Sequence, residues 1–221
     1  MADAKKASVR GPKHTMCRRV GYCLWGKANC PTASRIVKGK DGKEITINRP
    51  YPAGQHGPTK RRGKLSTYGE LLLEKQKLRT FYNVSERQLR FLYEKARQGQ
   101  GITGDKLLAS LEMRLTTAVY RAGLAPTIFA ARQIVSHRHV LVDGKPVNRG
   151  GYRLKKGQVV SIDPQRSPVI ADIAKGNDAA IPSYFQKEAG DCKFTVLDDM
   201  PKPEDINNNI EITKVIEFYA R

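Results

Sequence analysis

The chain has 221 residues, a length sufficient for one large or two small folded domains. Hydrophobic residues make up 39% of it and charged residues 28%, so we expect most of the chain to fold. Its formal net charge is +19 and its pI is about 10.0, and this basic excess favours a polyanionic partner: nucleic acid first, an anionic membrane second. No apolar run approaches the ~18 residues of a membrane span, and MADAKKASVRGPKHT has no apolar signal core, so we expect a cytoplasmic protein whose four cysteines are not in disulfides.

The charge is unevenly distributed along the chain. Residues 1–65 hold 16 Lys and Arg against 3 Asp and Glu, whereas residues 166–221 hold 7 against 10. A protein lying on nucleic acid would turn its basic parts inward and leave a more acidic part outside.

Residues 1–65 are predicted to be mostly irregular, apart from a short hairpin in IVKGKDGKEITI that turns at Asp41-Gly42. RPYPAGQHGPTKRRGK, residues 49–64, cannot bury enough apolar area alone to offset its chain entropy. One interpretation is a disordered basic tail. We favour a segment ordered by phosphates, because Tyr51, Gln55 and His56 add stacking and hydrogen-bonding groups to the charge.

Helical patterns begin at Ser66, where Thr67 and Glu70 have capping-box spacing. Further helices are predicted from Ser85 to Gly99, from about 105 to 122, and from about 127 onward. VLVDGKPVN then predicts a β-hairpin, because Asp-Gly favours a turn that fits strand twist, and YRLKKGQVVSID adds a strand. The tail from residue 166 is predicted to mix loops with short strands and to end in a closing strand, EITKVIEFYAR.

The segment SHRHVLVDGKPVNR, residues 136–149, raises the question of a catalytic or metal site. His137 and His139 are two residues apart, but no Asp, Glu or Cys stands near enough in sequence to suggest further metal ligands. Nucleophile-elbow, Walker, dinucleotide-glycine and HExxH motifs are absent from the sequence. The surrounding cations suit phosphate and 2′-hydroxyl contacts instead: Arg132, Arg138, Lys145 and Arg149.

LEMRLTTAVYRAGLAPTIFAARQIVSHRHVLVDGKPVN resembles the RNA-binding module shared by ribosomal protein S4 and several RNA-modifying enzymes. RPYPAGQHG, LLLEKQKLR, SERQLRFLYEKA and VIEFYAR resemble the bacterial ribosomal protein S4 family specifically. The resemblance covers roughly residues 10–165 and the last ten. Thr116-Thr117 stand where the family commonly has Asp-Asn, Arg138 stands where a glycine is usual, and segments 36–47 and 166–200 match poorly.

The resemblance implies an α+β fold with an irregular basic N-terminal extension (1–65), a helical domain (66–109 with 166–221), and an RNA-binding module of two helices and a small antiparallel sheet (110–165). It also implies a non-enzymatic component of the small ribosomal subunit that binds the 5′ domain of 16S rRNA early in assembly. Such a protein would lie near ribosomal protein S5 and help line the mRNA entry path in cytoplasmic ribosomes.

Carried over by position, the resemblance implies RNA contacts in the module and outside it. Those in the module are Arg114, Tyr120, Arg121, Arg132, Gln133, Ser136, His137, His139, Lys145 and Asn148. Those outside it are Arg49, Tyr51, Gln55, His56, Lys60, Arg61, Arg62, Lys75, Lys77 and Arg79.

HTMCRRVGYCLWGKANC holds a candidate zinc set of His14, Cys17, Cys23 and Cys30. Some members of the family bind zinc here through four cysteines, and Cys17 and Cys30 align with two of them. A Cys₃His set is an allowed zinc site, and the metal would give this core-poor segment a fixed shape. The second pair is separated by six residues, wider than the usual two to four, and the alternative is a decayed motif with free thiols.

Three other functions are weighed against the ribosomal one. A pseudouridine synthase or a tRNA synthetase fragment can carry the same module but would need a further catalytic domain. A stress-type RNA chaperone built on the module would lack RPYPAGQHG and VIEFYAR. A membrane-surface binder would need a basic amphipathic helix with bulky aromatics opposite the charges, which the sequence lacks.

Overall fold

A computed structural model describes residues 14–27, 30–32, 35–38, 44–47, 49, 51–59, 65–164, 166–177, 180–187, 192–198, 200–201, 203–206 and 209–220. The chain divides into two compact units: Met1–Glu86 with Asn209–Arg221, and Arg87–Asn208. None of the described helices combines the length and apolar composition that a bilayer crossing requires. The three-part domain division expected from the sequence stays a prediction.

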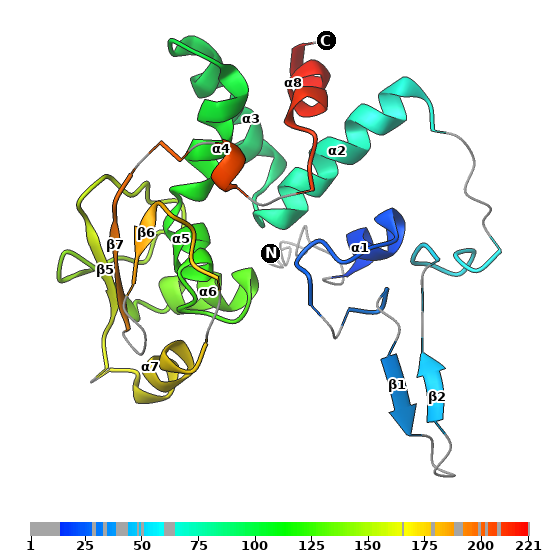
Figure 1. Ribbon diagram of the computed structural model, residues 1–221. Coiled ribbons are helices and arrows are strands. Elements are labelled where there is room, and N and C mark those ends of the chain that lie inside the picture. The colour runs from blue at the N-terminus through cyan, green and yellow to red at the C-terminus, as the bar shows by residue number, and fades with distance from the viewer. Residues whose placement is uncertain are drawn as a thin grey trace, which may run out of the picture. The chain divides into compact units, whose positions relative to one another are not determined.

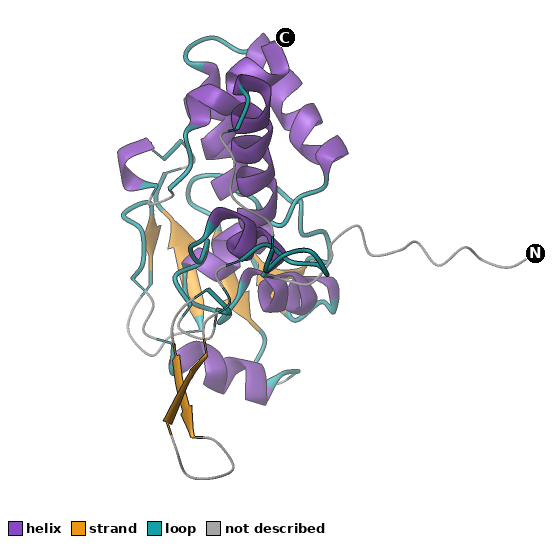
Figure 2. Ribbon diagram, turned by 90° about the vertical axis from the view of Figure 1, so that its right-hand side faces the viewer, coloured by secondary structure: helices purple, strands orange, loops and turns teal. Residues whose placement is uncertain are grey.

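The first unit contains two helices from its N-terminal part, a two-stranded ribbon and a C-terminal helix: α1 (Thr15–Val20), β1 (Arg35–Lys38), β2 (Glu44–Ile47), α2 (Thr67–Phe81) and α8 (Ile212–Ala220). The strands β1 and β2 pair antiparallel from Arg35↔Ile47 to Lys38↔Glu44, which confirms the predicted hairpin (Figure 2). The Asp41-Gly42 turn proposed for it lies outside the described residues.

Helix α8 packs along α2 (Figure 1), so the prediction of a closing strand in EITKVIEFYAR is wrong. Val215 is fully buried, and Phe218 and Tyr219 follow it at the three- and four-residue spacing of one helical face. The Lys75 ammonium lies 4.4 Å from the Phe218 ring centroid. The packing partner therefore selects a helix from a sequence whose β-branched and aromatic residues favour a strand.

The second unit combines helices with one antiparallel sheet, which confirms the α+β fold class. Its helices are α3 (Glu86–Gln98), α4 (Thr103–Glu112), α5 (Leu115–Arg121), α6 (Ile128–Ser136), α7 (Pro168–Lys175) and the 3₁₀ turn η1 (Pro203–Asp205). The sheet has the order β4-β3-β5-β7-β6, with β3 (Val140–Val142), β4 (Lys145–Pro146), β5 (Val159–Ile162), β6 (Phe185–Gln186) and β7 (Lys193–Val196). Strands β6 and β7 confirm short strands in the tail, whereas α7 was not predicted.

One hydrophobic core joins α5, α6 and α7 to the sheet. Its buried side chains include Val119, Val135, Val140, Val160 and Phe194. The predicted hairpin is confirmed, because β3 and β4 are joined by Asp143 (φ 49°) and Gly144 (φ 77°), the two positive φ angles of a type I′ turn.

The single helix predicted over residues 105–122 is wrong, because the chain breaks between α4 and α5. Arg114 is extended, with φ −72° and ψ 134°, and forms an isolated antiparallel bridge with Arg153. Leu115 N–H donates to the Tyr152 carbonyl (2.8 Å), and the Met113 carbonyl accepts from Leu154 N–H (2.9 Å). Hydrogen bonds to residues 152–154 thus replace those of a continuous helix, an outcome that the local periodicity of the stripe does not reveal.

Candidate RNA interface and metal centre

The segment from α6 to β4 presents its polar side chains from a buried scaffold. The Thr127 hydroxyl caps α6 by accepting from Ala130 N–H at 3.1 Å. The apolar face of the helix, which includes Ile128 and Val135, is buried. The opposite face and the following hairpin expose Arg132, Gln133, Ser136, His137, Lys145 and Asn148. The segment therefore offers cations and neutral hydrogen-bonding groups from a rigid support.

The turn after α6 fixes the two histidines. Arg138 has φ 63°, a left-handed conformation that favours glycine, the residue that the resemblance implies at this point. The His137 and His139 ring centroids are 5.9 Å apart. His139 Nδ1 forms a short hydrogen bond with the hydroxyl of buried Ser167, so the His139 ring is held in one orientation. This arrangement fixes the orientation of the His139 ring beside the exposed ring of His137.

Arg114 lies beside a glycine turn, and the charge of Arg132 acts on it. A methyl group added at Gly151 would lie 3.6 Å from both Nη1 and Nη2 of Arg114, so the guanidinium rests against a backbone without a side chain. Burial, and after it the charge of Arg132, lowers the pKa of Arg114. Among the described residues, no carboxylate forms an ion pair with either arginine. Two unneutralised guanidinium groups in one place suit a phosphate.

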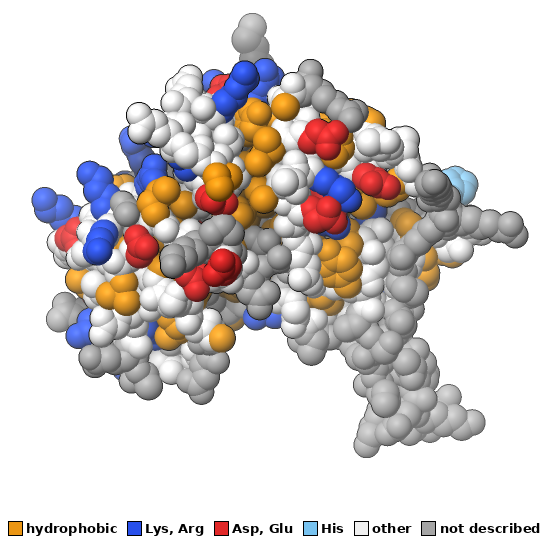
Figure 3. All heavy atoms as spheres, turned by 45° about the horizontal axis from the view of Figure 1, so that its top comes forward, with side chains coloured by type: hydrophobic (Ala, Val, Ile, Leu, Met, Phe, Trp, Pro, Cys, Tyr) orange, Lys and Arg blue, Asp and Glu red, His pale blue; other side chains and the backbone are white. Residues whose placement is uncertain are grey.

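Other predicted RNA contacts are already paired with carboxylates. Lys75 Nζ lies 2.9 Å from Glu86 Oε1, and Arg79 Nη1 lies 3.6 Å from Glu86 Oε2. Burial alone would raise the pKa of Glu86. Hydrogen bonds from Lys75 and Tyr219, together with the charges of Lys75 and Arg79, lower that pKa instead. Arg121 is similarly held, with Nη2 2.8 Å from the Oε1 of fully buried Glu112. Charges of both signs also share the face drawn in Figure 3, where acidic side chains lie among basic and hydrophobic ones.

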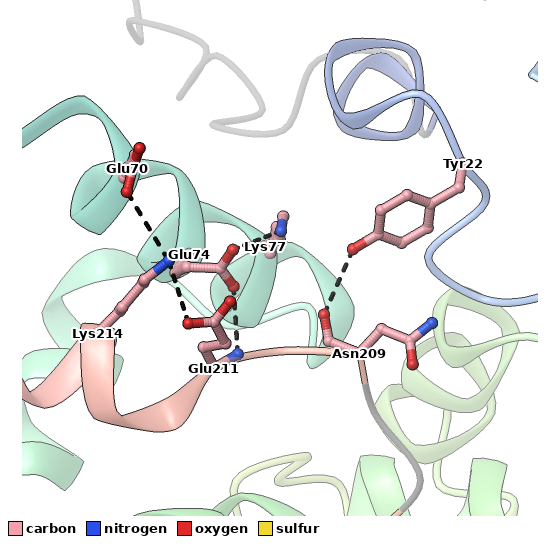
Figure 4. A network of polar contacts seen from close by, with 7 residues as sticks. All are labelled: Tyr22, Glu70, Glu74, Lys77, Asn209, Glu211 and Lys214. Carbon is pink, nitrogen blue, oxygen red and sulfur yellow. Dashed lines mark hydrogen bonds and ion pairs between the residues drawn. The ribbon is translucent and has the colours of Figure 1, made fainter. Parts of the chain in front are cut away.

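Lys77 belongs to a network that joins α2 to the start of α8 (Figure 4). The residues of this network are Tyr22, Glu70, Glu74, Lys77, Asn209, Glu211 and Lys214. Lys77 forms an ion pair with Glu74, and the other oxygen of Glu74 accepts from Glu211 N–H at 3.3 Å. The Tyr22 hydroxyl donates to the Asn209 carbonyl at 3.3 Å. Buried Lys77 therefore has a structural role within its unit.

The PYPAGQHG loop is fastened to α1 by Arg18. Its Nε donates to the Tyr51 carbonyl (3.1 Å), its Nη2 donates to the Pro52 carbonyl (3.2 Å), and its guanidinium carbon lies 4.9 Å from the Tyr51 ring centroid. Within the loop, a side chain at Gly57 would place its Cβ 2.0 Å from the Pro52 carbonyl oxygen. The tight closure leaves Gln55 and His56 exposed at the surface.

The candidate metal ligands converge in space. One ligand atom from each of His14, Cys17, Cys23 and Cys30 lies within 4.8 Å of the others, close to the ~3.8 Å between sulfurs that a tetrahedral site with ~2.3 Å Zn–S bonds requires. Cys17 Sγ accepts from Leu24 N–H at 3.5 Å, and Cys23 Sγ accepts from Lys27 N–H at 3.3 Å. Burial raises the pKa of the Cys17 thiol to about 12, a penalty that a coordinated cation would reverse. The donor set therefore fits zinc.

The candidate ligand Cys17 lies on α1, the same helix that carries Arg18 and so contacts the loop. Trp25 lies between the cluster and α2, because its ring centroid is 5.7 Å from that of His14 and its Nε1 donates to the Phe81 carbonyl at 3.2 Å. Arg49 N–H, beyond the ribbon, donates to the carbonyl of Pro31, the residue after Cys30, at 2.9 Å.

The structure places the predicted RNA contacts in four groups. Exposed side chains are those of Arg49, Gln55, His56, Arg132, Gln133, Ser136, His137, Lys145 and Asn148. Partly buried ones are those of Tyr51, Arg79, Arg114, Tyr120, Arg121 and His139, whereas Lys75 and Lys77 are buried. Lys60, Arg61 and Arg62 lie outside the described residues.

Sequence reasoning missed several residues that shape these sites: Arg18, Glu112, Gly151 and Ser167. Arg18 and Ser167 act through partners 33 and 28 residues away, and no local pattern indicates such pairs. The sequence does contain a Gly-Gly pair at 150–151, and such a pair indicates that another group can approach the backbone closely, as the Arg114 side chain does at Gly151.

Comparisons with known proteins agree over nearly the whole chain. Residues 8–112 match the ribosomal protein S4/S9 N-terminal domain family, and residues 113–160 match the S4 domain family. The chain is 41% identical over 202 residues to the small ribosomal subunit protein uS4 of Bifidobacterium animalis subsp. lactis, covering 89% of this chain and 93% of the relative. It is 39% identical over 218 residues to uS4 of Phocaeicola vulgatus and 40% identical over 219 residues to uS4 of Geobacillus kaustophilus, covering 97% of this chain and 100% of each relative.

Proposed function

The chain belongs to the uS4 family of small-subunit ribosomal proteins, which are not enzymes, and we propose that it binds 16S rRNA through the loop 51–59 and the segment 114–149. The observation that carries the proposal is the unneutralised pair of Arg114 and Arg132, set on the same scaffold as the exposed polar groups of α6 and the hairpin.

The binding mechanism follows from the kinds of group exposed. Arg132, Lys145 and Arg114 neutralise phosphates and release counterions, which makes the affinity depend on salt. His137, His139, Gln133 and other neutral groups donate to or accept from 2′-hydroxyls and base edges of a folded junction. Because α6 and the hairpin are fixed by one core, these groups select an RNA shape more than a base sequence.

The predicted RNA contacts that already form ion pairs within the protein should contribute less to RNA affinity. Lys75, Lys77, Arg79 and Arg121 reach RNA only if they exchange a carboxylate partner for a phosphate. Their contribution to affinity is therefore smaller than that of the exposed cations, since the lost ion pair offsets the new contact.

The finer cellular role follows the family resemblance. We propose binding to the 5′ domain of 16S rRNA, nucleation of subunit assembly, a position along the mRNA entry path and contact with ribosomal protein S5, all in the cytoplasm. The basic charge of residues 1–65 supports an N-terminal extension that wraps RNA, and the acidic excess of residues 166–221 supports an outward-facing segment.

We also propose that His14, Cys17, Cys23 and Cys30 hold one Zn²⁺ ion. The metal would have a structural role, adding to the few buried apolar side chains among the described residues of this segment. Its effect on RNA binding would pass through α1 and Arg18 to the loop that carries Gln55 and His56.

Salt-dependent binding to a transcript of the 16S 5′ domain tests the RNA proposal. Replacing both Arg132 and Lys145 with alanine should weaken binding and lower the slope of log K against log salt by about two units. The matched control is Lys175→Ala with Lys193→Ala, which removes two exposed cations from α7 and β7 and should leave the slope nearly unchanged. Equal slopes for the two double variants would remove Arg132 and Lys145 from the interface.

A further inference from the structure

Helix α3 carries an aromatic side chain on the face that points away from its own core. The buried side is formed by Leu89, Tyr93 and Ala96. Phe91 lies on the opposite side, and 62% of its surface is exposed. More than half of the ring is therefore available to a partner.

Basic residues flank Phe91 at one-turn spacing on the same face. Arg87 precedes it by four residues and Lys95 follows it by four, and both side chains are exposed. Among the described residues, no carboxylate forms an ion pair with either of them. The acidic residue of this face, Glu94, is paired with Arg90 at 3.1 Å. The phenyl ring thus stands between two cations whose charges are not neutralised.

This pattern matches the chemistry of an unpaired nucleotide. A base stacks on an exposed aromatic ring, and the phosphates on either side of it pair with cations one helical turn away. An acidic protein segment would satisfy the cations alone, and a second copy of this face would bring like charges together. The net charge of +19 makes RNA the partner that this face attracts at a distance.

We propose that Arg87, Phe91 and Lys95 form a stacking platform for one unpaired nucleotide of ribosomal RNA. The platform rests on the proposed rRNA binding, but it belongs to α3 and includes none of the residues assigned to the interface above. It adds a contact that reads an unstacked base, whereas the segment 114–149 reads the shape of a folded junction.

The test measures binding of full-length protein to the 16S 5′-domain transcript. Phe91→Ala and Phe91→Leu should each weaken binding about tenfold without changing the salt slope, because stacking releases no counterions. Phe91→Tyr should bind like the wild type. Arg87→Ala with Lys95→Ala should lower the slope by about 1.4 units, since each cation that meets a single-stranded phosphate contributes about 0.7.

Val169→Ala is the matched control, because Val169 is 69% exposed on α7 and has Asp172 rather than a cation one turn along. A photoreactive phenylalanine analogue at position 91 should crosslink to one unpaired nucleotide. Wild-type affinity in Phe91→Ala, a crosslink to a neighbouring protein in assembled subunits, or a self-association that Phe91→Ala abolishes would each overturn the platform. Failure of the wild-type protein to bind the transcript would instead overturn the proposed function.

Discussion

Residues 14–59 and residues 113–162 are held together by opposite means. In the described part of the first segment, the buried apolar side chains are few: Met16, Cys17, Leu24 and Cys30. The contacts described there are a cluster of candidate metal ligands and the hydrogen bonds that Arg18, Trp25 and Tyr22 donate to backbone carbonyls. In the second segment, helices and strands share one continuous hydrophobic core.

The difference teaches how a basic protein can present two kinds of surface. A hydrophobic core fixes the polar groups of α6 and the β3–β4 hairpin, because burial of apolar side chains within the protein does not depend on a bound ligand. The loop 51–59 has few large apolar side chains and is rich in Gly and Pro, so a core of its own cannot order it. It accepts hydrogen bonds from Arg18 on α1, the helix that also carries the candidate metal ligand Cys17.

The largest expected effect comes from removing the metal. Purified protein should contain about one Zn²⁺ per chain, and a chelator should disorder residues 14–59, because structural zinc contributes roughly 10 kcal/mol of apparent binding free energy to such segments. Trp25, the single tryptophan, contacts the cluster, so its fluorescence should change on chelation. The secondary structure of residues 87–208 should remain, as circular dichroism would show.

Cysteine variants separate the metal from general thiol effects. Cys17→Ser should lose zinc and show the fluorescence of the chelated protein. Cys192→Ser removes a partly buried thiol whose Sγ lies 3.4 Å from the Ala171 carbonyl, and it should keep zinc and an unchanged fluorescence. A protein with less than ~0.1 equivalent of zinc and a Trp25 signal indifferent to chelator would contradict the metal proposal.

The second largest expected effect is a loss of stability when the buried carboxylate of Glu112 is removed. Glu112 is fully buried, accepts from Arg121 at 2.8 and 3.2 Å, and accepts from the Tyr184 hydroxyl at 3.0 Å. Glu112→Gln should lower the free energy of unfolding by about 3–5 kcal/mol, because it leaves the charge of Arg121 without its partner. Urea titration followed by circular dichroism measures this loss, and zinc content and Trp25 fluorescence in water should not change.

The control for that variant is Glu94→Gln on α3. Glu94 and Arg90 also form an ion pair, but their side chains are 56% and 72% exposed, so the change should be below about 0.5 kcal/mol. Equal effects of the two variants would mean that burial of the Glu112 pair does not set its importance.

The smallest effect sharpens the comparison inside the core. Thr117 is 1% exposed, and its hydroxyl has no hydrogen-bond partner among the described residues, whereas the adjacent Thr116 hydroxyl donates to the Gly150 carbonyl at 3.0 Å. Thr117→Val should raise the free energy of unfolding by about 1 kcal/mol, and Thr116→Val should lower it by a similar amount. Thermal and urea unfolding measure both, and a stabilising Thr116→Val would contradict the assignment.

Local patterns predicted those parts of the fold in which every local signal agrees with the tertiary structure. The helix after Thr127 and the Asp143-Gly144 hairpin are examples, because cap, apolar period and turn residues point the same way. The convergence of the four candidate metal ligands was also predictable, since they lie within 17 residues of sequence.

The remaining features depend on partners distant in sequence. The break at Arg114 is made by residues 150–154, and α8 is selected by its packing on α2. The same limit applies to the site: Lys75, Lys77 and Arg121 match the family pattern, but their pairing with Glu86, Glu74 and Glu112 follows from the folded structure. Arg138 stands where the family pattern implies glycine, and its left-handed backbone shows why glycine suits that position.

The packing of α8 on α2 also determines the order in which the two units can complete their folding during translation. Contacts such as Tyr219 hydroxyl to Glu86 and Glu211 N–H to Glu74 span 133 and 137 residues, so α2 leaves the translating ribosome long before its covering helix exists. Residues 87–208 are contiguous and can fold during translation, but the N-terminal unit can complete itself only after they have been made. A nascent chain paused before α8 would therefore expose the apolar side of α2 to chaperones.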